Sequence, residues 1–227
     1  MTLATGVLNL TVTLSAAAPM TTTVAYATSN GTATAGSDYL AQAGTLVFAP
    51  NQTSKTIAIP IIDDLSDEPN ETFSVTLNSP NNAALGTPSS STVTITDDDL
   101  APSVAWENST VTVGEGIGSA LLAVNLSAAS AFTVTVVYST TNGSALAGIP
   151  PNGDYTGTIG TLTFAPGVSS RTVSVPITND SAPESSETIN LTLSSPSNAT
   201  LGTPNPATLT IIDDETPPPT GEQRLCR

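Results

Sequence analysis

The sequence contains no histidine, a single cysteine and only four lysine and arginine residues. Without histidine, and with Cys226 in the C-terminal tail, the usual nitrogen and sulfur ligands of zinc or copper are missing from the body of the chain. One cysteine also cannot form an internal disulfide. The four basic residues face nineteen acidic ones, for a net charge of −15. Because nucleic-acid binding needs lysine or arginine to neutralise phosphates, the sequence argues against it.

Aromatic residues and long apolar runs are also scarce. The chain has one tryptophan, four tyrosines and four phenylalanines, so its core must be aliphatic. No apolar run approaches the roughly 18 residues that span a bilayer, so we expect no membrane insertion by this segment. The N-terminus does not resemble a signal peptide. Valine, leucine and isoleucine alternate with threonine and serine, which is typical of half-buried strands and predicts an all-β fold.

The second half of the chain repeats the first. Phe48 recurs as Phe164, a step of 116 residues, and the same step carries Pro60 to Pro176. A repeat of this length indicates domains rather than short solenoid units. We therefore expect the division to be domain 1 at 1–99, domain 2 at 100–216 and a proline-rich linker or tail at 217–227.

The two copies differ in two ways. The Asn-Gly pair at 30–31 matches the pair at 142–143 at a step of only 112, so copy two has four residues inserted around 149–152. Copy one also starts late, with Leu3 at the position of Glu115. Its first strand is expected to be missing, as in a fragment of a longer array.

Connectors rich in proline, glycine, serine and asparagine separate short strand segments at the spacing of a β-sandwich. For copy two the expected strands are 103–113 (broken near Glu107), 120–126, 133–138, 161–164, 172–177, 188–193 and 208–212. For copy one they are 24–26, 45–48, 56–61, 72–77 and 92–95. A proline recurs inside one strand of each copy, which marks that strand as an edge or a bulge.

Most acidic residues fall into two matching sets, and only Asp67, Glu107 and Glu222 lie outside them. The set in copy one is Asp38, Asp63, Asp64, Glu68, Glu71, Asp97, Asp98 and Asp99. The set in copy two is Glu115, Asp154, Asp180, Glu184, Glu187, Asp213, Asp214 and Glu215.

The direction of the strands places each set at one end of its sandwich. If each connector reverses the chain, connectors alternate between the two ends. In copy two the acids lie in one series of connectors, whereas the alternate ones, 127–131, 165–170 and 194–206, contain none. So many carboxylates without basic partners repel one another unless a cation binds. Ca²⁺ takes 6–8 oxygen ligands in flexible geometry, whereas Mg²⁺ keeps several waters. The pattern predicts Ca²⁺, with more than one ion per complete domain; the alternative is that the acids are solvated loops.

The motifs that carry these acids resemble the Calx-beta domain family. In copy two they are Val113-Gly114-Glu115-Gly116, Asn142-Gly143, Gly153-Asp154-Tyr155, Asp180-x3-Glu184-x2-Glu187-Thr188 and Thr210-Ile211-Ile212-Asp213-Asp214-Glu215. Copy one repeats them as Asn30-Gly31, Gly36-Ser37-Asp38-Tyr39, Asp63-Asp64-x3-Glu68-x2-Glu71-Thr72 and Asp97-Asp98-Asp99. The resemblance implies two tandem immunoglobulin-like antiparallel β-sandwich domains, with Ca²⁺ held by loops at one end, and the matched acids as ligands. Asn179 replaces the acid at Asp63, and Glu115 has no counterpart in copy one.

Three classes of function follow. The family occurs in sodium–calcium exchangers, an integrin subunit and many bacterial surface proteins, and low lysine with abundant threonine is most similar to the last group. The main hypothesis is thus a Ca²⁺-rigidified structural or adhesive segment of a larger extracellular or cell-surface protein. Its domains would run head to tail, with a metal at Asp97–Asp99 stiffening the linker 100–102. Its partners would be calcium ions and further domains of the parent chain. The alternative is a Ca²⁺ sensor regulating an attached transporter or enzyme.

Catalysis is the least favoured class. Two neighbouring glutamates such as Glu184 and Glu187 could serve as the acid and base of a glycosidase. That chemistry also needs a cleft that holds a sugar, and Trp106 is the only tryptophan. We therefore expect no enzyme activity.

Overall fold

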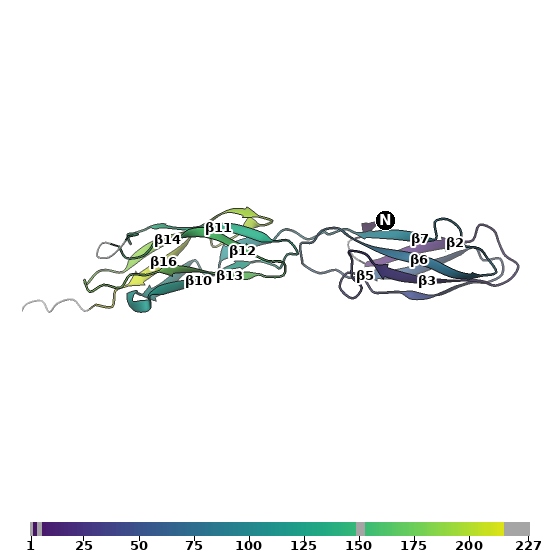
Figure 1. Ribbon diagram of the computed structural model, residues 1–227, viewed down its shortest axis with the longest axis horizontal. Helices are drawn as coiled ribbons and strands as arrows, with labels where there is room; N and C mark the ends of the chain where they lie inside the picture. Colours follow the sequence, from purple (N-terminus) through teal and green to yellow (C-terminus); the bar gives the residue numbers. More distant parts are fainter. Residues whose placement is uncertain (1, 4–5, 149–152, 216–227) are drawn as a thin grey trace, which may run out of the picture. The chain divides into compact units, whose positions relative to one another are not determined.

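The computed structural model describes residues 2–3, 6–148 and 153–215, and these residues are almost entirely β-structure (Figure 1). The chain divides into two compact units, unit 1 at Met1–Asp99 and unit 2 at Leu100–Arg227. The tail at 217–227 and the inserted residues around 149–152 lie outside the described part. Within that part, the longest run of helix is a single turn, and none could cross a membrane.

Unit 2 is a sandwich of two sheets. One sheet has the order β13-β10-β8-β15, with β8 at Ser103–Trp106, β10 at Ser119–Leu126, β13 at Ser170–Pro176 and β15 at Thr200–Leu201. The other has the order β12-β11-β14-β16-β9, with β9 at Thr110–Gly114, β11 at Val134–Asn142, β12 at Ile159–Phe164, β14 at Glu187–Ser197 and β16 at Ala207–Ile212. A 3₁₀ turn, η1 at Glu115–Ile117, follows β9. Neighbouring strands are antiparallel except in the pairs β8–β15 and β9–β16.

The predicted break in the first strand of copy two is present, and it divides this strand between the two sheets. β8 pairs with β10 in one sheet, whereas β9 pairs with β16 in the other. The three residues between them, 107–109, therefore carry the chain from one sheet to the other. Val104 and Trp106 of β8 are buried in the core between the sheets.

Unit 1 repeats this plan with fewer strands. Its larger sheet has the order β1-β7-β6-β3-β4, with β1 at Thr2–Leu3, β3 at Thr22–Asn30, β4 at Ala43–Phe48, β6 at Glu71–Asn81 and β7 at Ser90–Ile95. In the smaller sheet, β2 at Gly6–Thr13 pairs with β5 at Ser54–Ile61. Pro60 and Pro176 lie in β5 and β13, each of which pairs with one other strand among the described residues, besides an isolated bridge at Ile61 and at Ile177. This agrees with the edge position, one of the two alternatives predicted for these prolines.

The expectation that unit 1 lacks its whole first strand needs a correction. β1 pairs in parallel with β7, just as β9 pairs with β16, so the second half of that strand is present as two residues. No described residue of unit 1 takes the place of β8. The sequence reasoning missed β1 because the link between β1 and β2 is two residues shorter than the link between β9 and β10, which shifts the alignment.

Candidate metal centre

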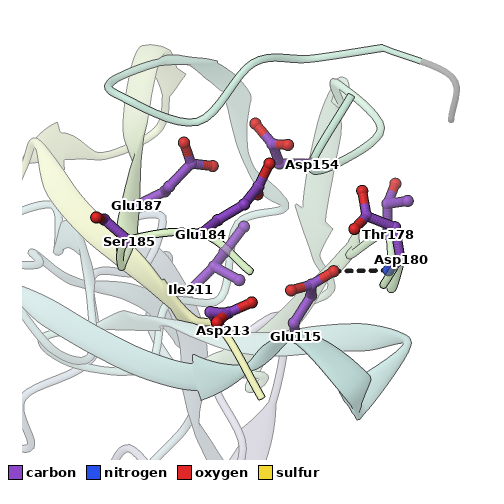
Figure 2. Close-up of a pocket in the computed structure, with 9 residues that line it drawn as sticks. All are labelled: Glu115, Asp154, Thr178, Asp180, Glu184, Ser185, Glu187, Ile211 and Asp213. Atoms are coloured by element: carbon purple, nitrogen blue, oxygen red, sulfur yellow. Dashed lines mark hydrogen bonds between the residues drawn. The ribbon is translucent and has the colours of Figure 1, made fainter. Parts of the chain in front are cut away.

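Six acidic residues of unit 2 come from four separate parts of the chain and line one pocket (Figure 2). Glu115 opens η1, Asp154 lies between β11 and β12, and Glu184 precedes β14. The remaining polar lining comes from Thr178, Asp180, Ser185, Glu187 and Asp213, and none of the lining residues is basic. The pocket has a volume of about 10 Å³, which is close to the smallest space that holds one water-sized occupant.

The loop that carries Asp154 is fixed by an asparagine that begins it. Asn142 Oδ1 accepts hydrogen bonds from the backbone N–H of Ala147 at 3.0 Å and from the hydroxyl of buried Tyr155 at 2.8 Å. Asp154 Oδ2 itself accepts from Leu146 N–H at 2.6 Å. These bonds hold the carboxylate at the pocket before any ligand is present.

The same loop in unit 1 has the same bonds. Asn30 Oδ1 accepts from Ala35 N–H at 3.1 Å and from Tyr39 Oη at 2.7 Å, while Asp38 Oδ2 accepts from Thr34 N–H at 2.6 Å. The glycine after each asparagine is needed because a Cβ on Gly31 would collide with the backbone carbonyl of the strand alongside. The repeated Asn-Gly motif is thus the anchor of the acid-bearing loop, a role that the sequence reasoning did not assign.

Glu115 joins two of these connections. Its side chain is only 7% exposed, and its Oε1 accepts a hydrogen bond from the backbone N–H of Asp180 at 2.7 Å (Figure 2). Asp180 Oδ1 in turn accepts from Ala182 N–H at 2.6 Å, which closes a turn in the connection between β13 and β14. Because burial of an unpaired carboxylate is costly, a cation is expected beside Glu115.

Three carboxylates come close enough to share one ion at two places in unit 2. In each group the candidate ligand oxygens lie within 4.8 Å of one another. One group is Asp154, Glu184 and Glu187. The other is Glu115, Asp213 and Glu215.

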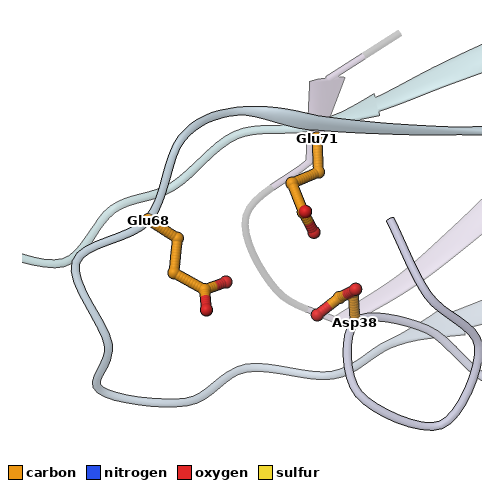
Figure 3. A group of neighbouring side chains, drawn as sticks. All are labelled: Asp38, Glu68 and Glu71. Carbon is orange, nitrogen blue, oxygen red and sulfur yellow. The ribbon is translucent and has the colours of Figure 1, made fainter. Parts of the chain in front are cut away.

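Unit 1 has one group of this kind among its described residues. Asp38, Glu68 and Glu71 point toward one another (Figure 3), and they occupy the positions of Asp154, Glu184 and Glu187 in unit 2. Asp97 and Asp99 stand at the positions of Asp213 and Glu215. Because no acid replaces Glu115, they do not complete a second group.

The remaining predicted ligands lie near these groups without entering them. Burial raises the pKa of Glu68 most, and the charges of Asp64 and Asp97 raise it further. For the pKa of Asp99 burial is again the largest cause, and the charges of Asp98 and Asp63 add to it. Asp214 lies beside η1, since its Oδ2 would be 2.9 Å from a Cβ placed on Gly116. The Oδ1 of Asn179 would be 3.9 Å from the same point, so this residue, expected to weaken the cluster, is also at its rim.

Crowding of carboxyl groups raises the pKa of three glutamates to about 7. For Glu187 the largest cause is partial burial, followed by a hydrogen bond and charge repulsion from Asp154. For Glu71, partial burial is again first and the charge of Asp38 second. For Glu215 the largest cause is the hydrogen bond that its carboxyl makes with Asp213. In the absence of a cation, protons are therefore retained near neutral pH where carboxylates converge.

The residues fit a hard cation. Asp213 Oδ1 and Glu215 Oε2 are buried. With both carboxyl groups ionised, neither oxygen has a hydrogen-bond donor, so a cation is the partner that they lack. All the clustered ligands are carboxylate oxygens, which Ca²⁺ prefers and which zinc and copper sites use less. Thr178 and Ser185 add hydroxyl groups to the lining, which sequence spacing alone did not identify.

Comparison with known proteins gives a consistent result. Two successive matches to the family model described as Calx-beta domain cover residues 2–99 and 97–215. Sodium/calcium exchanger 1 of Bos taurus is 35% identical over 191 residues, which are 76% of this chain and 19% of the exchanger. Sodium/calcium exchanger 3 of Homo sapiens is 32% identical over 194 residues, with 76% and 21% coverage. This chain thus spans about a fifth of the length of these relatives.

Among the solved structures that match along most of the chain is CBD12 from CALX1.2. It is 25% identical and has a TM-score of 0.44, with 91% of this chain and 93% of that chain covered. The relatives named above are vertebrate exchangers, so they give no support to the expectation of a bacterial surface protein or an extracellular location.

Proposed function

The chain belongs to the Calx-beta domain family, and on that premise we propose that it is a Ca²⁺-sensing module of a larger protein. The observation that carries this proposal is the convergence of carboxylates from separate connections into three-ligand groups in both units. A module that reads Ca²⁺ needs ligands from segments that can move relative to one another. The group of Asp154, Glu184 and Glu187 meets this condition, because it combines a fixed loop with a more exposed stretch.

The fixed and exposed parts of the site are distinct in unit 2. Asp154 is held by its hydrogen bond from Leu146 and by the Asn142 anchor. Glu184, in contrast, lies in the stretch 181–186, where every residue is exposed. Ca²⁺ bound between Asp154 and Glu184 would draw this exposed stretch onto the fixed loop. Such a movement is the change that an attached domain would detect.

The second group would bind an ion against the end of β16. Glu115 and Asp213 would supply oxygens from two different connections, together with Glu215. An ion here would fix the residues that follow the last strand of unit 2. In unit 1 the residues at the equivalent place, Asp97–Asp99, lead into unit 2. The predicted head-to-tail order of the domains, and stiffening of the linker 100–102 by a metal, remain part of the proposal.

We place sensing above adhesion because of the relatives. Sodium/calcium exchangers share about a third of their residues with this chain over most of its length. An adhesive or purely structural role needs only that Ca²⁺ stiffens the chain. The relatives named above are exchangers and not adhesins, so they do not support that role. A regulated transporter is therefore the attached partner that we favour.

A catalytic role is disfavoured by the size of the site. The acidic pocket of about 10 Å³ has no room for a sugar beside Glu184 and Glu187.

Calorimetric titration of the whole chain with Ca²⁺, combined with thermal melts, tests the proposal. We expect saturable binding and a higher melting temperature, because a ligand that binds only the folded state adds RT ln(1 + [L]/Kd), about 2.7 kcal/mol at a hundred times Kd. A Kd of roughly 10⁻⁷–10⁻⁵ M would indicate a sensor, whereas roughly 10⁻⁴–10⁻³ M is typical of extracellular modules.

The matched variants are Glu187→Gln and Glu107→Gln. Both remove one negative charge, but Glu107 is exposed and lies outside the acidic sets. We expect Glu187→Gln to weaken Ca²⁺ binding and Glu107→Gln to leave it unchanged. Absence of heat and of any melting shift in the parent chain would reduce the acids to solvated loops and refute the proposal.

A further inference from the structure

A tyrosine connects the two sheets of unit 2 at the acidic end. The backbone of Tyr155 extends the sheet of β13, because this residue forms an antiparallel bridge with Ile177, directly after β13. In the same stretch, Thr178 N–H donates to Asp154 O at 2.9 Å. The hydroxyl of Tyr155 donates to Oδ1 of Asn142, the last residue of β11 in the other sheet, at 2.8 Å. The Tyr155–Asn142 hydrogen bond is therefore an inter-sheet bond.

The inter-sheet bond lies between two carboxylates of one metal group. Asp154 directly precedes Tyr155, so it is attached to the edge of the sheet that contains β13. Glu187 is the first residue of β14, which pairs with β11 in the other sheet at Ile189↔Asn142. The separation of these two carboxylates thus depends on the spacing of the sheets, which the inter-sheet bond holds at this end.

This bond is costly to break. Tyr155 is 0% exposed and its ring belongs to the core of unit 2. Without its acceptor, the phenol hydroxyl would be left in the core with no partner, and a buried unsatisfied polar group is unfavourable. Asn142 Oδ1 also accepts from Ala147 N–H at 3.0 Å, so the same oxygen holds the loop that leads to Asp154.

Unit 1 has the same bond and a second contact beside it. The hydroxyl of Tyr39 donates to Asn30 Oδ1 at 2.7 Å. The ring of Tyr39 also stacks on Phe73 of β6, with ring centroids 4.1 Å apart and planes inclined by 11°. Phe73 lies two residues after Glu71, and the same position of unit 2 is Ile189. Unit 2 therefore depends more on the hydroxyl than unit 1 does.

We propose that the inter-sheet bond of unit 2 makes its metal group selective for Ca²⁺ over Mg²⁺, with Tyr155 as a positioning residue. This inference rests on the proposed function. Ca²⁺ binds carboxylate oxygens directly at about 2.3–2.6 Å, whereas Mg²⁺ keeps several waters and contacts one or two carboxylates. An ion that needs Asp154 and Glu187 together requires their correct spacing, and an ion held largely through water tolerates a change. Groups that support metal ligands commonly alter metal affinity in this way.

Tyr155→Phe tests the proposal, because it keeps the ring in the core and removes only the hydroxyl. We expect the Ca²⁺ affinity of unit 2 to fall roughly three- to tenfold, the effect of one hydrogen bond. The Mg²⁺ affinity should change less than about twofold. NMR titration of the whole chain with each ion separates the units at the amides of Leu146 and Thr34, which donate to Asp154 and Asp38.

Three further variants serve as controls. Tyr39→Phe should have a smaller effect on unit 1, because its ring stays stacked. Tyr138→Phe makes the same change on β11 at a partly buried ring whose hydroxyl lies beside Gly160, and should leave both affinities unchanged. Asn142→Ala removes the acceptor, so adding Tyr155→Phe to it should cause no further loss of Ca²⁺ affinity.

Hydrogen exchange of the metal-free protein gives a readout that needs no ion. Tyr155→Phe should speed the exchange of Ala147 N–H and Thr178 N–H, which hold the two sides of the Asp154 loop. The same amides should exchange at the parent rate in Tyr138→Phe.

Two results would overturn the proposal while the proposed function stands. Equal losses of Ca²⁺ and Mg²⁺ affinity in Tyr155→Phe would mean that this residue only stabilises the fold. An unchanged Ca²⁺ affinity would mean that the carboxylates keep their spacing without the inter-sheet bond. Absence of Ca²⁺ binding by the parent chain is a different result, because it would refute the proposed function and this inference together.

Discussion

Units 1 and 2 share a sequence pattern but differ in how completely they use it. In unit 2, β8 pairs with the outer side of β10, whereas no described residue of unit 1 pairs with β2 on that side. Unit 2 has two groups of three convergent carboxylates, whereas the described part of unit 1 has one. Both differences arise from one stretch of chain, residues 103–117 in unit 2. That stretch supplies the strand β8 first and then Glu115.

This common origin links the core of the domain to its metal site. The strand that covers the apolar core continues through β9 into η1, where Glu115 is delivered to the pocket. A domain without it keeps the group formed by Asp38, Glu68 and Glu71, because these residues come from later connections. The two carboxylate groups can therefore occur independently. The group of Asp154, Glu184 and Glu187 needs only the later connections, whereas the group of Glu115, Asp213 and Glu215 also needs the first strand.

The largest difference is expected for a leucine at the same position in both units. Leu122→Ala in unit 2 should cost about 2–5 kcal/mol of unfolding free energy, because it removes a buried side chain from a closed core. Leu10→Ala in unit 1 should cost clearly less, because Leu10 already borders a groove. Urea denaturation and calorimetry measure the unfolding free energy of both variants. The fluorescence of Trp106, the only tryptophan, identifies the unfolding of unit 2.

The neighbouring leucine provides the control. Leu121 is 71% exposed, so Leu121→Ala should change the unfolding free energy by about 0.5 kcal/mol at most. Equal costs for Leu10→Ala and Leu122→Ala would contradict the difference in packing between the units.

Glu115→Gln makes unit 2 similar to unit 1 at the metal site. The amide oxygen can still accept the hydrogen bond from Asp180 N–H, but the charge is lost. We expect one fewer ion in unit 2, or binding weaker by about tenfold or more, which corresponds to about 1.4 kcal/mol. Titration calorimetry measures the number of ions, with Glu107→Gln as the charge-matched control. An unchanged stoichiometry and affinity would remove Glu115 from the ligand set.

Much of this comparison could be predicted from the sequence. The alternation of threonine with aliphatic residues identified the strands, and the step of 116 residues identified the two units. The break near Glu107 was also predicted, but its effect was not, since a periodicity of two does not show that β8 and β9 enter different sheets. Pairing between distant strands, such as β8 with β10 and β15, leaves no local pattern.

The acidic residues show a similar limit. Reversal of direction at each connector placed Glu115, Asp154 and Asp213 at one end, and the structure brings them to one pocket. The reversal of direction did not predict which carboxylate oxygens converge, because their convergence depends on turns such as the one closed by the hydrogen bond between Ala182 and Asp180. The anchoring role of Asn30 and Asn142 was hidden because their partners, the tyrosines, follow only after a loop of variable length.

The pH dependence compares the units without mutation. A carboxyl whose pKa is raised from 4.5 to about 7 on folding contributes stability that is fully present below pH 4.5 and is lost as the pH rises through 7. In metal-free buffer, both units should therefore become less stable between pH 4.5 and 7. Unit 2 should change more, because two of its glutamates, Glu187 and Glu215, have a pKa of about 7, against one, Glu71, in unit 1.

Ca²⁺ should reverse this trend, because the ion displaces the retained protons. Affinity is expected to rise from pH 5 to 8, with proton release detected as a buffer-dependent heat in titration calorimetry. A metal-free stability that stays flat over this range would contradict the raised pKa values.

The smallest expected effect comes from exchanging the residues at the position where unit 1 has the acid Asp63 and unit 2 has the amide Asn179. Asn179→Asp gives unit 2 the acid that unit 1 has at Asp63, beside Asp214 and η1. Because Ca²⁺ affinity increases with the number of charged ligands, we expect roughly two- to fivefold tighter binding in unit 2. The metal-free unit should become slightly less stable, since another negative charge joins the cluster.

The reciprocal change, Asp63→Asn, should weaken binding in unit 1 by a similar factor while unit 2 stays unchanged. Asn108→Asp adds the same charge at an exposed residue outside the two acidic sets and separates a local effect from a general one. Tighter binding with Asn179→Asp but not with Asn108→Asp would establish that position 179 tunes the site. If both variants behaved alike, the asparagine would be a rim residue that affects binding only through the overall charge, and the affinity of unit 2 would depend on its two groups of three carboxylates.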